Sequence, residues 1–480
     1  MNTTTKSMAM PQKLGKPFWV VWAVELWERF GFYGVQAILA MYFVKQLGYS
    51  ETESFYVFGS FSAFVYGFVW IGGWIGDKYL GAKRTMMLGG IVLMFAYAAL
   101  ALATRNTIFY ALAGIVVGNA LFKANPSSII SKMYAKGDTA LDSAMTMYYM
   151  GVNLGAFFSM AITPIIAQNY GWGYAYGICS AGLFFGLLNY FFYRHLLDGL
   201  NTDIEKQAMC LKRLSIVIGV SVAAIILIAH LLYHTQVCDV IVYTVVGGAF
   251  LYFLRIAFSL HSVERARMII ALVLIIQAVI FFVLYNQMPT SLTFFAMHNI
   301  DNNFHGWMIP PAEYQVLNSL VIVIMAPILA WLYRLFPATH VSKFCIGMTL
   351  CALGFLVLAI PSFTSITGLA SPWWLVLSYF LQSTGELFIS ALGLAMVAEL
   401  CPTNRSGFVM GVWFLSVMLS GPIGAWIGAL TVPSTGVAAV NVLDGMHLYG
   451  KVFLEIGVVT GVITLLMWLA RPALNRLLAN

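Results

Sequence analysis

The chain has 480 residues, of which 61% are hydrophobic and only 9% are charged, and its mean hydropathy is +0.86. Soluble domains contain about 25% charged residues, so this composition excludes a soluble protein and predicts an integral membrane protein. The formal net charge is +7, but the basic residues form no stripe of the kind that binds nucleic acid. The six cysteines form no CxxC pair, and we interpret them as small packing residues.

Fourteen apolar runs are long enough to cross a bilayer, which takes about 20 residues. They extend over 17–44, 55–76, 85–104, 107–131, 143–167, 174–196, 214–233, 239–259, 268–296, 312–336, 342–361, 373–400, 407–431 and 448–470. We therefore predict an all-α membrane protein. Its domains are an N-terminal six-helix bundle (1–196), a linker with two inserted helices (197–262) and a C-terminal six-helix bundle (263–480).

Lys and Arg are distributed unevenly between the two ends of the predicted helices. Lys45, Arg105 and Lys451 fall at one end, Arg29 and Lys123 fall within spans, and the other twenty of the 25 bases fall at the end where the chain begins. Because cytoplasmic loops are rich in Lys and Arg, we predict that both termini are cytoplasmic. If one helix had been missed, all later loops would change sides and the bias would disappear. The bias therefore also supports the count of fourteen.

The stretch VELWERFGFYG places three ionisable side chains within the first span. A charge at the bilayer centre costs about 2.5–3.5 kcal/mol on insertion scales, so these side chains should face one another or a wet cavity. Glu25, Arg29 and Tyr33 share a helix face at i, i+4 and i+8, and Glu before Arg is the favourable order for an ion pair. Glu28 lies one step round the helix, where it can point to a neighbouring helix.

Two further ionisable residues lie within later spans, Lys123 in GNALFKANPSS and Glu386 in GELFISALGL. Lys123 is a candidate partner for Glu28. One interpretation is a buried ion network that only joins helices, but Glu386 would then need a partner of its own. The other is a set of coupled acids and bases whose protonation changes when a pair opens, as a proton-coupled transporter requires.

Neutral polar and aromatic residues in the spans would supply such a cavity with hydrogen-bonding groups and flat walls. A lone Tyr or Trp in a span is more often an interfacial anchor or a packing residue. The candidates are Tyr33, Tyr66, Tyr148, Tyr149, Asn153, Tyr285, Asn286, Asn318 and Trp413.

The segment GGWIGDKYLGAKR connects the second and third spans. Its glycines allow a tight turn, and Asp77 with Lys83 and Arg84 can lock a loop at the end where the chain begins. The segment resembles the loop signature of the major facilitator superfamily, with one additional residue between Asp and Gly. The alternative is an ordinary basic loop.

Five motifs, in order along nearly the whole chain, resemble those of the proton-dependent oligopeptide transporter family, and most closely its bacterial dipeptide and tripeptide permeases. They are ELWERFGFY, GNALFKANPSS, YYMGVNLG, GELFISALGL and MGVWFLS. The resemblance implies the major facilitator superfamily fold, with twelve core helices in two bundles and two extra helices.

The resemblance also implies roles for individual residues. Proton coupling would involve Glu25, Glu28, Arg29 and Lys123. Glu386 would receive the amino terminus of the peptide, and Lys123 would lie near its carboxylate. The residues implied in substrate binding are Arg29, Tyr33, Tyr66, Lys123, Tyr149, Asn153, Asn286, Asn318, Glu386, Ser390 and Trp413.

Five positions depart from the family's motifs. Phe32 replaces the first tyrosine of a pair, Ala120 replaces a glycine, and Ser319 and Ala391 replace prolines. Asn286 stands where many relatives have an acid, so an outer gate closed by a salt bridge at that position is in doubt. Tyr285, Asn286 and Gln287 would hydrogen-bond there instead.

The resulting hypothesis is a proton-coupled symporter that imports dipeptides and tripeptides by alternating access. It would lie in a bacterial inner membrane and work as a monomer, with the proton as coupling ion and no metal or cofactor. One alternative is a carrier of the same fold for another small substrate, such as nitrate, a glucoside or a drug-like compound. A receptor or enzyme is a second, but no nucleophile, His and acid fall in one pocket.

Overall fold

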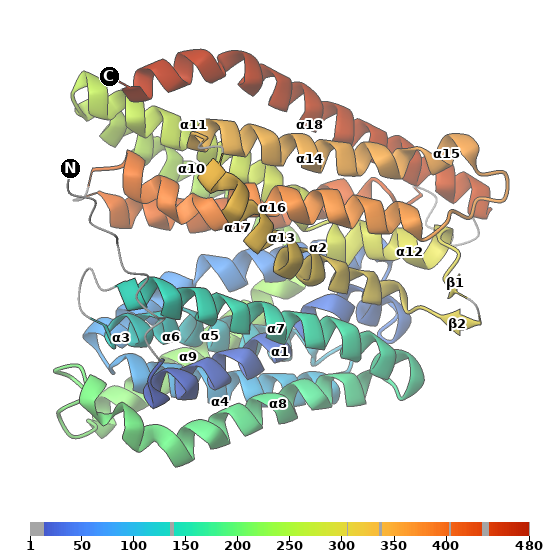
Figure 1. The fold of residues 1–480 in the computed structure, drawn as a ribbon. Coiled ribbons are helices and arrows are strands. Elements are labelled where there is room, and N and C mark those ends of the chain that lie inside the picture. Colours follow the sequence, from blue (N-terminus) through green and yellow to red (C-terminus); the bar gives the residue numbers. More distant parts are fainter. Residues whose placement is uncertain are drawn as a thin grey trace.

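The computed structural model describes residues 14–134, 139–304, 306–335, 338–402, 405–433 and 441–479. Within these ranges the chain is almost entirely helical (Figure 1). A small antiparallel sheet of β1 (Asn303–Phe304) and β2 (Trp307–Met308) lies at the end of the molecule opposite the two termini.

The first eight helices make six passes along the long axis of the molecule. Ser50 and Glu53 form a capping box at the start of the second pass, which satisfies backbone donors that the helix leaves free. The helices are α1 (Lys16–Lys45), α2 (Glu51–Gly67) continued by α3 (Val69–Lys78), α4 (Ala82–Ala101), α5 (Ile108–Lys123) continued by α6 (Asn125–Ser131), α7 (Thr139–Asn169) and α8 (Trp172–Tyr193).

A 3₁₀ helix, η1 (Arg194–Leu200), leads into the two helices predicted as an insert, α9 (Leu211–Tyr233) and α10 (Thr235–Ser259). The helix α9 packs against α5, whereas α10 packs mainly against α17 and α11. The inserted pair therefore contacts helices from both halves of the chain.

The remaining helices make a second set of six passes. The first of them is interrupted by a π-helical turn, η2 (Met288–Leu292), which contains Pro289. The helices are α11 (Ser262–Tyr285) with α12 (Thr293–Asn299), α13 (Val316–Leu335) preceded by the 3₁₀ helix η3 (Pro311–Gln315), α14 (His340–Ala359) with α15 (Pro361–Thr364), α16 (Trp373–Leu400), α17 (Ser406–Ala429) and α18 (Val442–Ala479).

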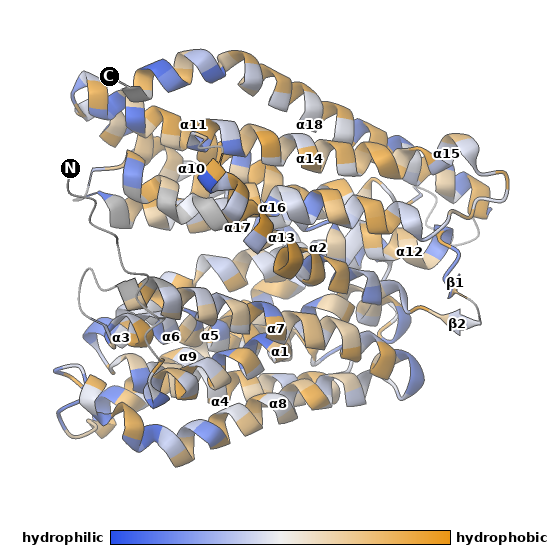
Figure 2. Ribbon diagram, in the orientation of Figure 1, coloured by the Kyte–Doolittle hydropathy of each residue, from blue (hydrophilic) through white to orange (hydrophobic). Residues whose placement is uncertain are grey.

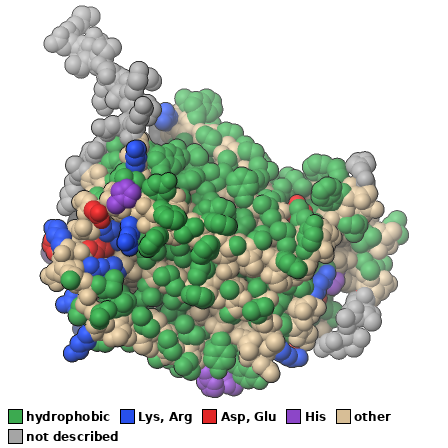
Figure 3. All heavy atoms as spheres, turned by 90° about the horizontal axis from the view of Figure 1, so that it is seen from below, with side chains coloured by type: hydrophobic (Ala, Val, Ile, Leu, Met, Phe, Trp, Pro, Cys, Tyr) green, Lys and Arg blue, Asp and Glu red, His purple; other side chains and the backbone are tan. Residues whose placement is uncertain are grey.

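Helices lie at all fourteen predicted positions. In the part of the chain that the structure describes, twelve segments are long and apolar enough to cross a membrane. The other two positions are those of α1, which contains Glu25, Glu28 and Arg29, and α16, which contains Glu386. Apolar residues cover the helices along most of their length (Figure 2), and Lys and Arg gather mainly toward one end of the face seen from below (Figure 3). The chain is a multi-pass membrane protein.

The two halves of the molecule meet most closely where α2 crosses α17. A Cβ atom added at Gly421 would lie 2.3 Å from the carbonyl oxygen of Gly59, and one added at Gly59 would lie 2.5 Å from that of Gly421. Only residues without a side chain let two helix backbones approach this closely.

Polar contacts join the halves near the end that carries β1 and β2. Nε2 of His298 lies 2.7 Å from Oε1 of Glu51, and Nε2 of Gln315 donates to the carbonyl oxygen of Ala37 at 2.9 Å. In Figure 1 the two halves diverge toward the opposite end, where the termini lie. The structure is therefore closed at the β1–β2 end.

Candidate functional site

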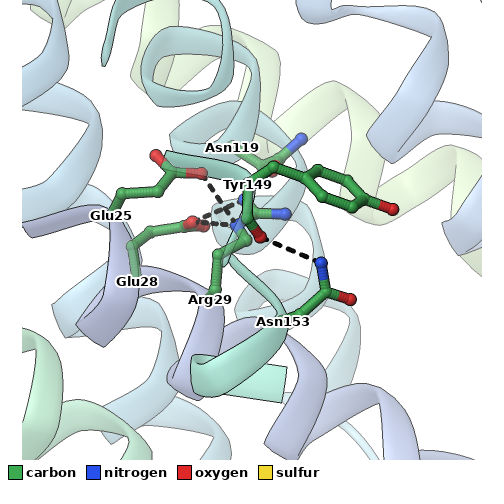
Figure 4. A network of polar contacts seen from close by, with 6 residues as sticks. All are labelled: Glu25, Glu28, Arg29, Asn119, Tyr149 and Asn153. Atoms are coloured by element: carbon green, nitrogen blue, oxygen red, sulfur yellow. Dashed lines mark hydrogen bonds and ion pairs between the residues drawn. The ribbon is translucent and has the colours of Figure 1, made fainter. Parts of the chain in front are cut away.

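A cluster of three ionisable side chains lies buried on α1. Nε of Arg29 lies 3.5 Å from Oε1 of Glu25, and Nη2 of Arg29 lies 2.5 Å from Oε2 of Glu28 (Figure 4). All three side chains are at most 2% exposed. The predicted i,i+4 pair of Glu25 and Arg29 is confirmed.

Neighbouring helices complete the surroundings of Arg29. Its Nη2 donates to Oδ1 of Asn119 on α5 at 3.3 Å, and Nδ2 of Asn119 donates to the carbonyl oxygen of Val65 on α2 at 3.0 Å. The guanidinium carbon lies 5.0 Å from the ring centroid of Phe32 and 6.0 Å from that of Tyr33. Phe32, the departure from the tyrosine pair, thus offers Arg29 an aromatic face in place of a hydroxyl.

The predicted pair of Glu28 and Lys123 does not form in this structure. Glu28 pairs with Arg29 on its own helix instead, because that guanidinium reaches both carboxylates. Lys123 is half-buried and makes no ion pair within 4.0 Å among the described residues, although Glu25, Glu28 and Arg29 are near enough to act on its charge. It is the last residue of α5, directly before the helix restarts as α6 at Asn125.

Two buried acceptors in the cluster lack a partner. Oε2 of Glu25 and Oε1 of Glu28 accept no hydrogen bond from the described residues. A buried carboxylate oxygen without a donor is costly, so a proton or a donor supplied from outside would stabilise this side of the cluster.

The predicted acid on the C-terminal half, Glu386, lies on α16. Nδ2 of Asn318, on α13, donates to Oε2 of Glu386 at 2.7 Å and to Oγ of Ser383 at 3.0 Å. No cationic side chain among the described residues lies within 4.0 Å of Glu386. The structure therefore places a carboxyl group without a basic partner among the described residues on the C-terminal half, opposite the two basic residues Arg29 and Lys123 on the N-terminal half.

A narrow cavity lies between the two halves, next to the charged cluster on α1 and to Glu386. It includes the predicted residues Tyr33, Tyr285 and Asn318. It also includes residues that the sequence did not single out, namely Gln36, Met160, Met288, Pro289 and Gln315. Gln36 is three residues beyond Tyr33 on one helix, so the α1 periodicity could have identified it. Gln315 lies on η3, a short helix whose position no periodic pattern indicates.

The remaining predicted residues differ in how far they are exposed. Tyr149 on α7 is 43% exposed, and Tyr66 and Ser390 are half-buried. Nδ2 of Asn153 donates to the carbonyl oxygen of Tyr149 at 2.9 Å (Figure 4), so its amide nitrogen is held by its own helix. Trp413 is buried and packs edge-on against Phe282, at a centroid distance of 6.1 Å.

Asn286 and Gln287 hydrogen-bond, as predicted, but within the C-terminal half. Nδ2 of Asn286 donates to Oγ of Ser420 at 2.9 Å, and Nε2 of Gln287 donates to the carbonyl oxygen of Gly424 at 2.9 Å. Both partners lie on α17, so these amides join α11 to α17. The polar contacts between the two halves described above are made by His298 and Gln315 instead.

The loop motif differs in its partners from the prediction. Asp77 is exposed, whereas Lys83 and Arg84 hold the segment between α8 and α9. Nζ of Lys83 donates to the carbonyl oxygen of Leu197 at 2.9 Å and also contacts Asn201. The backbone N–H of Lys83 donates to Oε1 of Glu205 at 2.7 Å. The motif anchors the segment that leads into the inserted helices.

No group of three or more His, Cys, Asp or Glu residues able to hold a metal ion occurs in the described part of the chain. The site consists of buried charges, amides and aromatic rings placed between two helical halves. This arrangement defines a membrane transporter of the two-bundle type.

Comparisons with known proteins identify the family. The POT family model matches residues 83–443. The chain is 45% identical over 471 residues to dipeptide and tripeptide permease A of Escherichia coli (strain K12), covering 97% of this chain and 94% of that protein. It is 43% identical over 472 residues to dipeptide and tripeptide permease B of Aeromonas hydrophila, covering 96% and 94%.

Among solved structures, the chain resembles that of tetrameric PepTSo2. The TM-score is 0.86 at 35% identity, covering 96% of this chain and 99% of the other. The chain belongs to the POT family of peptide transporters. The resemblance deduced from its motifs and the predicted fold are both confirmed.

Proposed function

We propose that this protein is a proton-coupled symporter that imports dipeptides and tripeptides by alternating access. The observation that carries the proposal is the separation of charge across the cavity, with Arg29 and Lys123 in one half and the unpaired Glu386 in the other. Its relatives are named dipeptide and tripeptide permeases, and proton coupling is a property of the family.

A short peptide is a zwitterion whose charges lie at its two ends. Its carboxylate suits Arg29 and Lys123, and its ammonium group suits Glu386. A bound peptide would therefore touch both halves at once and favour their closure around it. The remaining contacts would come from Tyr33, Tyr66, Tyr149, Asn153, Asn286, Asn318, Ser390 and Trp413.

Proton coupling would follow from competition for Arg29. In the structure, both Glu25 and Glu28 hold the guanidinium. Protonation of one carboxylate would weaken its ion pair with Arg29, so that the guanidinium could bind the carboxylate of a peptide. A proton and a peptide would then bind together. Lys123, near the cluster but unpaired, would join the same exchange.

The moving units would be the bundles 1–196 and 263–480, with 197–262 between them. The contacts at Gly59, Gly421, Glu51 and His298 describe a state closed at the β1–β2 end. The distribution of Lys and Arg supports a placement with that end outside and both termini in the cytoplasm of a bacterium, across its inner membrane. Arg29, Lys123 and Glu386 all belong to one chain, so we propose that the monomer transports. PepTSo2 itself is described as tetrameric.

Uptake of a labelled dipeptide into proteoliposomes tests the proposal. An imposed pH gradient, acidic outside, should concentrate the peptide by about tenfold per pH unit if one proton accompanies each peptide, since a factor of ten corresponds to about 1.4 kcal/mol. Empty liposomes and a collapsed gradient are the controls. A failure to concentrate peptide, with orientation verified, would exclude the function. Competition by glucosides or nitrate and not by peptides would favour another substrate.

A further inference from the structure

A second cavity lies far from the central site, at the end of the molecule where the termini lie. Its volume is ≈ 220 Å³, and it opens between the α3–α4 loop and the start of α9. The side chains of Arg84 and Arg213 line it, together with Tyr79 and Cys210. The transport cycle proposed above assigns this cavity no role.

The charge of this cavity is not balanced by its own residues. None of the residues that line it is acidic, and neither arginine forms an ion pair within 4.0 Å among the described residues. The carboxylate of Glu205 is directed elsewhere, to the backbone N–H of Lys83 and to Thr202. Two cations therefore share a concave site without an anion.

Both arginines are held in place by neutral partners. Nη2 of Arg84 donates to the carbonyl oxygens of Gln207 at 2.8 Å and of Glu205 at 3.2 Å. The guanidinium of Arg213 lies 5.8 Å from the ring centroid of Tyr79. An arginine has five N–H donors in a planar fork, so each retains donors for a ligand, and such forks match phosphate oxygens well.

The start of α9 adds to the attraction for an anion. Cys210 precedes the helix, and a hydrogen bond from the first-turn N–H of Arg213 lowers the pKa of its thiol; a helix N-terminus favours negative charge in this way. Met209 and Leu211 beside it are 46% and 75% exposed. An apolar exposed surface next to a basic cavity is the arrangement expected at the boundary between lipid tails and headgroups.

We propose that this cavity binds a phosphate group, supplied either by the headgroup of an anionic phospholipid or by inorganic phosphate. The bound anion would join the α3–α4 loop to the start of α9 by bridging Arg84 and Arg213. It would thereby attach the inserted helix pair to the N-terminal half.

Cys210 provides a reporter within the cavity itself. It is the exposed cysteine of the six, and the other five are buried. The neutral, membrane-permeant reagent N-ethylmaleimide should therefore label Cys210 first, and a bound phosphate group should block it. By mass action, an anion at ten times its dissociation constant should slow labelling by about tenfold.

The experiment compares labelling rates in vesicles of phosphatidylcholine alone and with added phosphatidylglycerol, oleate or inorganic phosphate. Slower labelling with phosphatidylglycerol and not with oleate at equal charge identifies the lipid headgroup. Slower labelling with inorganic phosphate in phosphatidylcholine vesicles identifies the free anion. Each rate is taken relative to that of the same variant without the anion, so that altered thiol reactivity cancels.

Arg213→Gln should remove most of the protection, and Arg84→Gln should weaken it as a second variant. The matched control is Arg255→Gln, which removes an exposed base on α10, outside the cavity, and should retain full protection. The proposal is overturned if no anion slows labelling, if oleate protects as well as phosphatidylglycerol, or if protection survives in Arg213→Gln.

Discussion

At the scale of single residues, both acids of the α1 cluster have one buried carboxylate oxygen without a donor among the described residues. Glu28 makes the closer contact to Arg29, at 2.5 Å against 3.5 Å for Glu25. The same residue is thus both a partner of the cation that would bind a peptide and a group that a proton would satisfy.

Replacing Glu28 with Gln should uncouple transport from the proton gradient. The amide keeps the shape of the side chain but cannot take up a proton, so accumulation of a dipeptide should fall from about tenfold per pH unit to none. Exchange of labelled for unlabelled peptide should continue. Measurement of both fluxes in the same proteoliposomes separates coupling from binding. Undiminished accumulation would remove Glu28 from the coupling role.

A substitution at Glu386 tests its proposed contact with the ammonium group of the peptide. Glu386→Ala should weaken a peptide with a free amino terminus by about 2–5 kcal/mol, the cost of losing one partner of a buried charge pair. An N-acetylated peptide has no ammonium group, so its half-saturation concentration should hardly change. Competition assays with the two peptides give the comparison. Equal weakening of both would contradict the assigned contact.

At the scale of helices, the closest approach in the molecule that bears on gating is that of α2 and α17. Their backbones meet at Gly59 and Gly421, where no Cβ atom can be accommodated. The amides of Asn286 and Gln287 support this contact indirectly, because they attach α11 to α17. An acid at position 286 is therefore not required to hold these helices together.

Gly421→Ala should hinder closure of the outer end. The added methyl group would lie 2.3 Å from the carbonyl oxygen of Gly59, and overpacking of this kind costs about 1–3 kcal/mol. Uptake should fall by roughly fivefold or more, while the folded protein persists. Gly411→Ala in the same helix is the control, since no atom lies within 4 Å of a Cβ there. Equal uptake by the two variants would show that the close approach does not limit transport.

At the scale of the whole molecule, the two halves are joined by contacts of unequal strength. The pair of His298 and Glu51 is partly exposed, at 43% and 20% for the two side chains. Exposed ion pairs contribute about 0.2–1 kcal/mol, less than close helix packing. The packing of α2 on α17 should therefore decide the closed state, with the ion pair as a minor contribution.

Glu51→Gln should accordingly lower uptake by at most about fivefold, the factor that corresponds to 1 kcal/mol. His298→Gln and the double variant complete a mutant cycle, and the coupling energy between the two positions should stay below about 1 kcal/mol. Loss of transport comparable to that of Gly421→Ala would instead make the ion pair the principal lock.

Much of this protein follows from its sequence alone. Fourteen passes and the ionisable residues Glu25, Arg29 and Glu386 inside the helices could be predicted because lipid penalises every unpaired charge and every unsatisfied backbone group. The pairing of Glu25 with Arg29 follows from helical spacing within one element. Such features depend on the solvent and on local geometry, which a single sequence contains.

Which of several candidate partners each side chain contacts was decided by the tertiary structure. Glu28 contacts Arg29 on its own helix and not Lys123 on α5, Asn286 contacts Ser420, and Lys83 contacts the segment before α9. The sequence offered each of these side chains more than one candidate partner. Which one lies within hydrogen-bond reach depends on how the helices tilt and cross, and helix packing is set by many small contacts at once. For the same reason, the arginine-lined cavity beside Cys210 could be seen only after the loop and α9 were placed together.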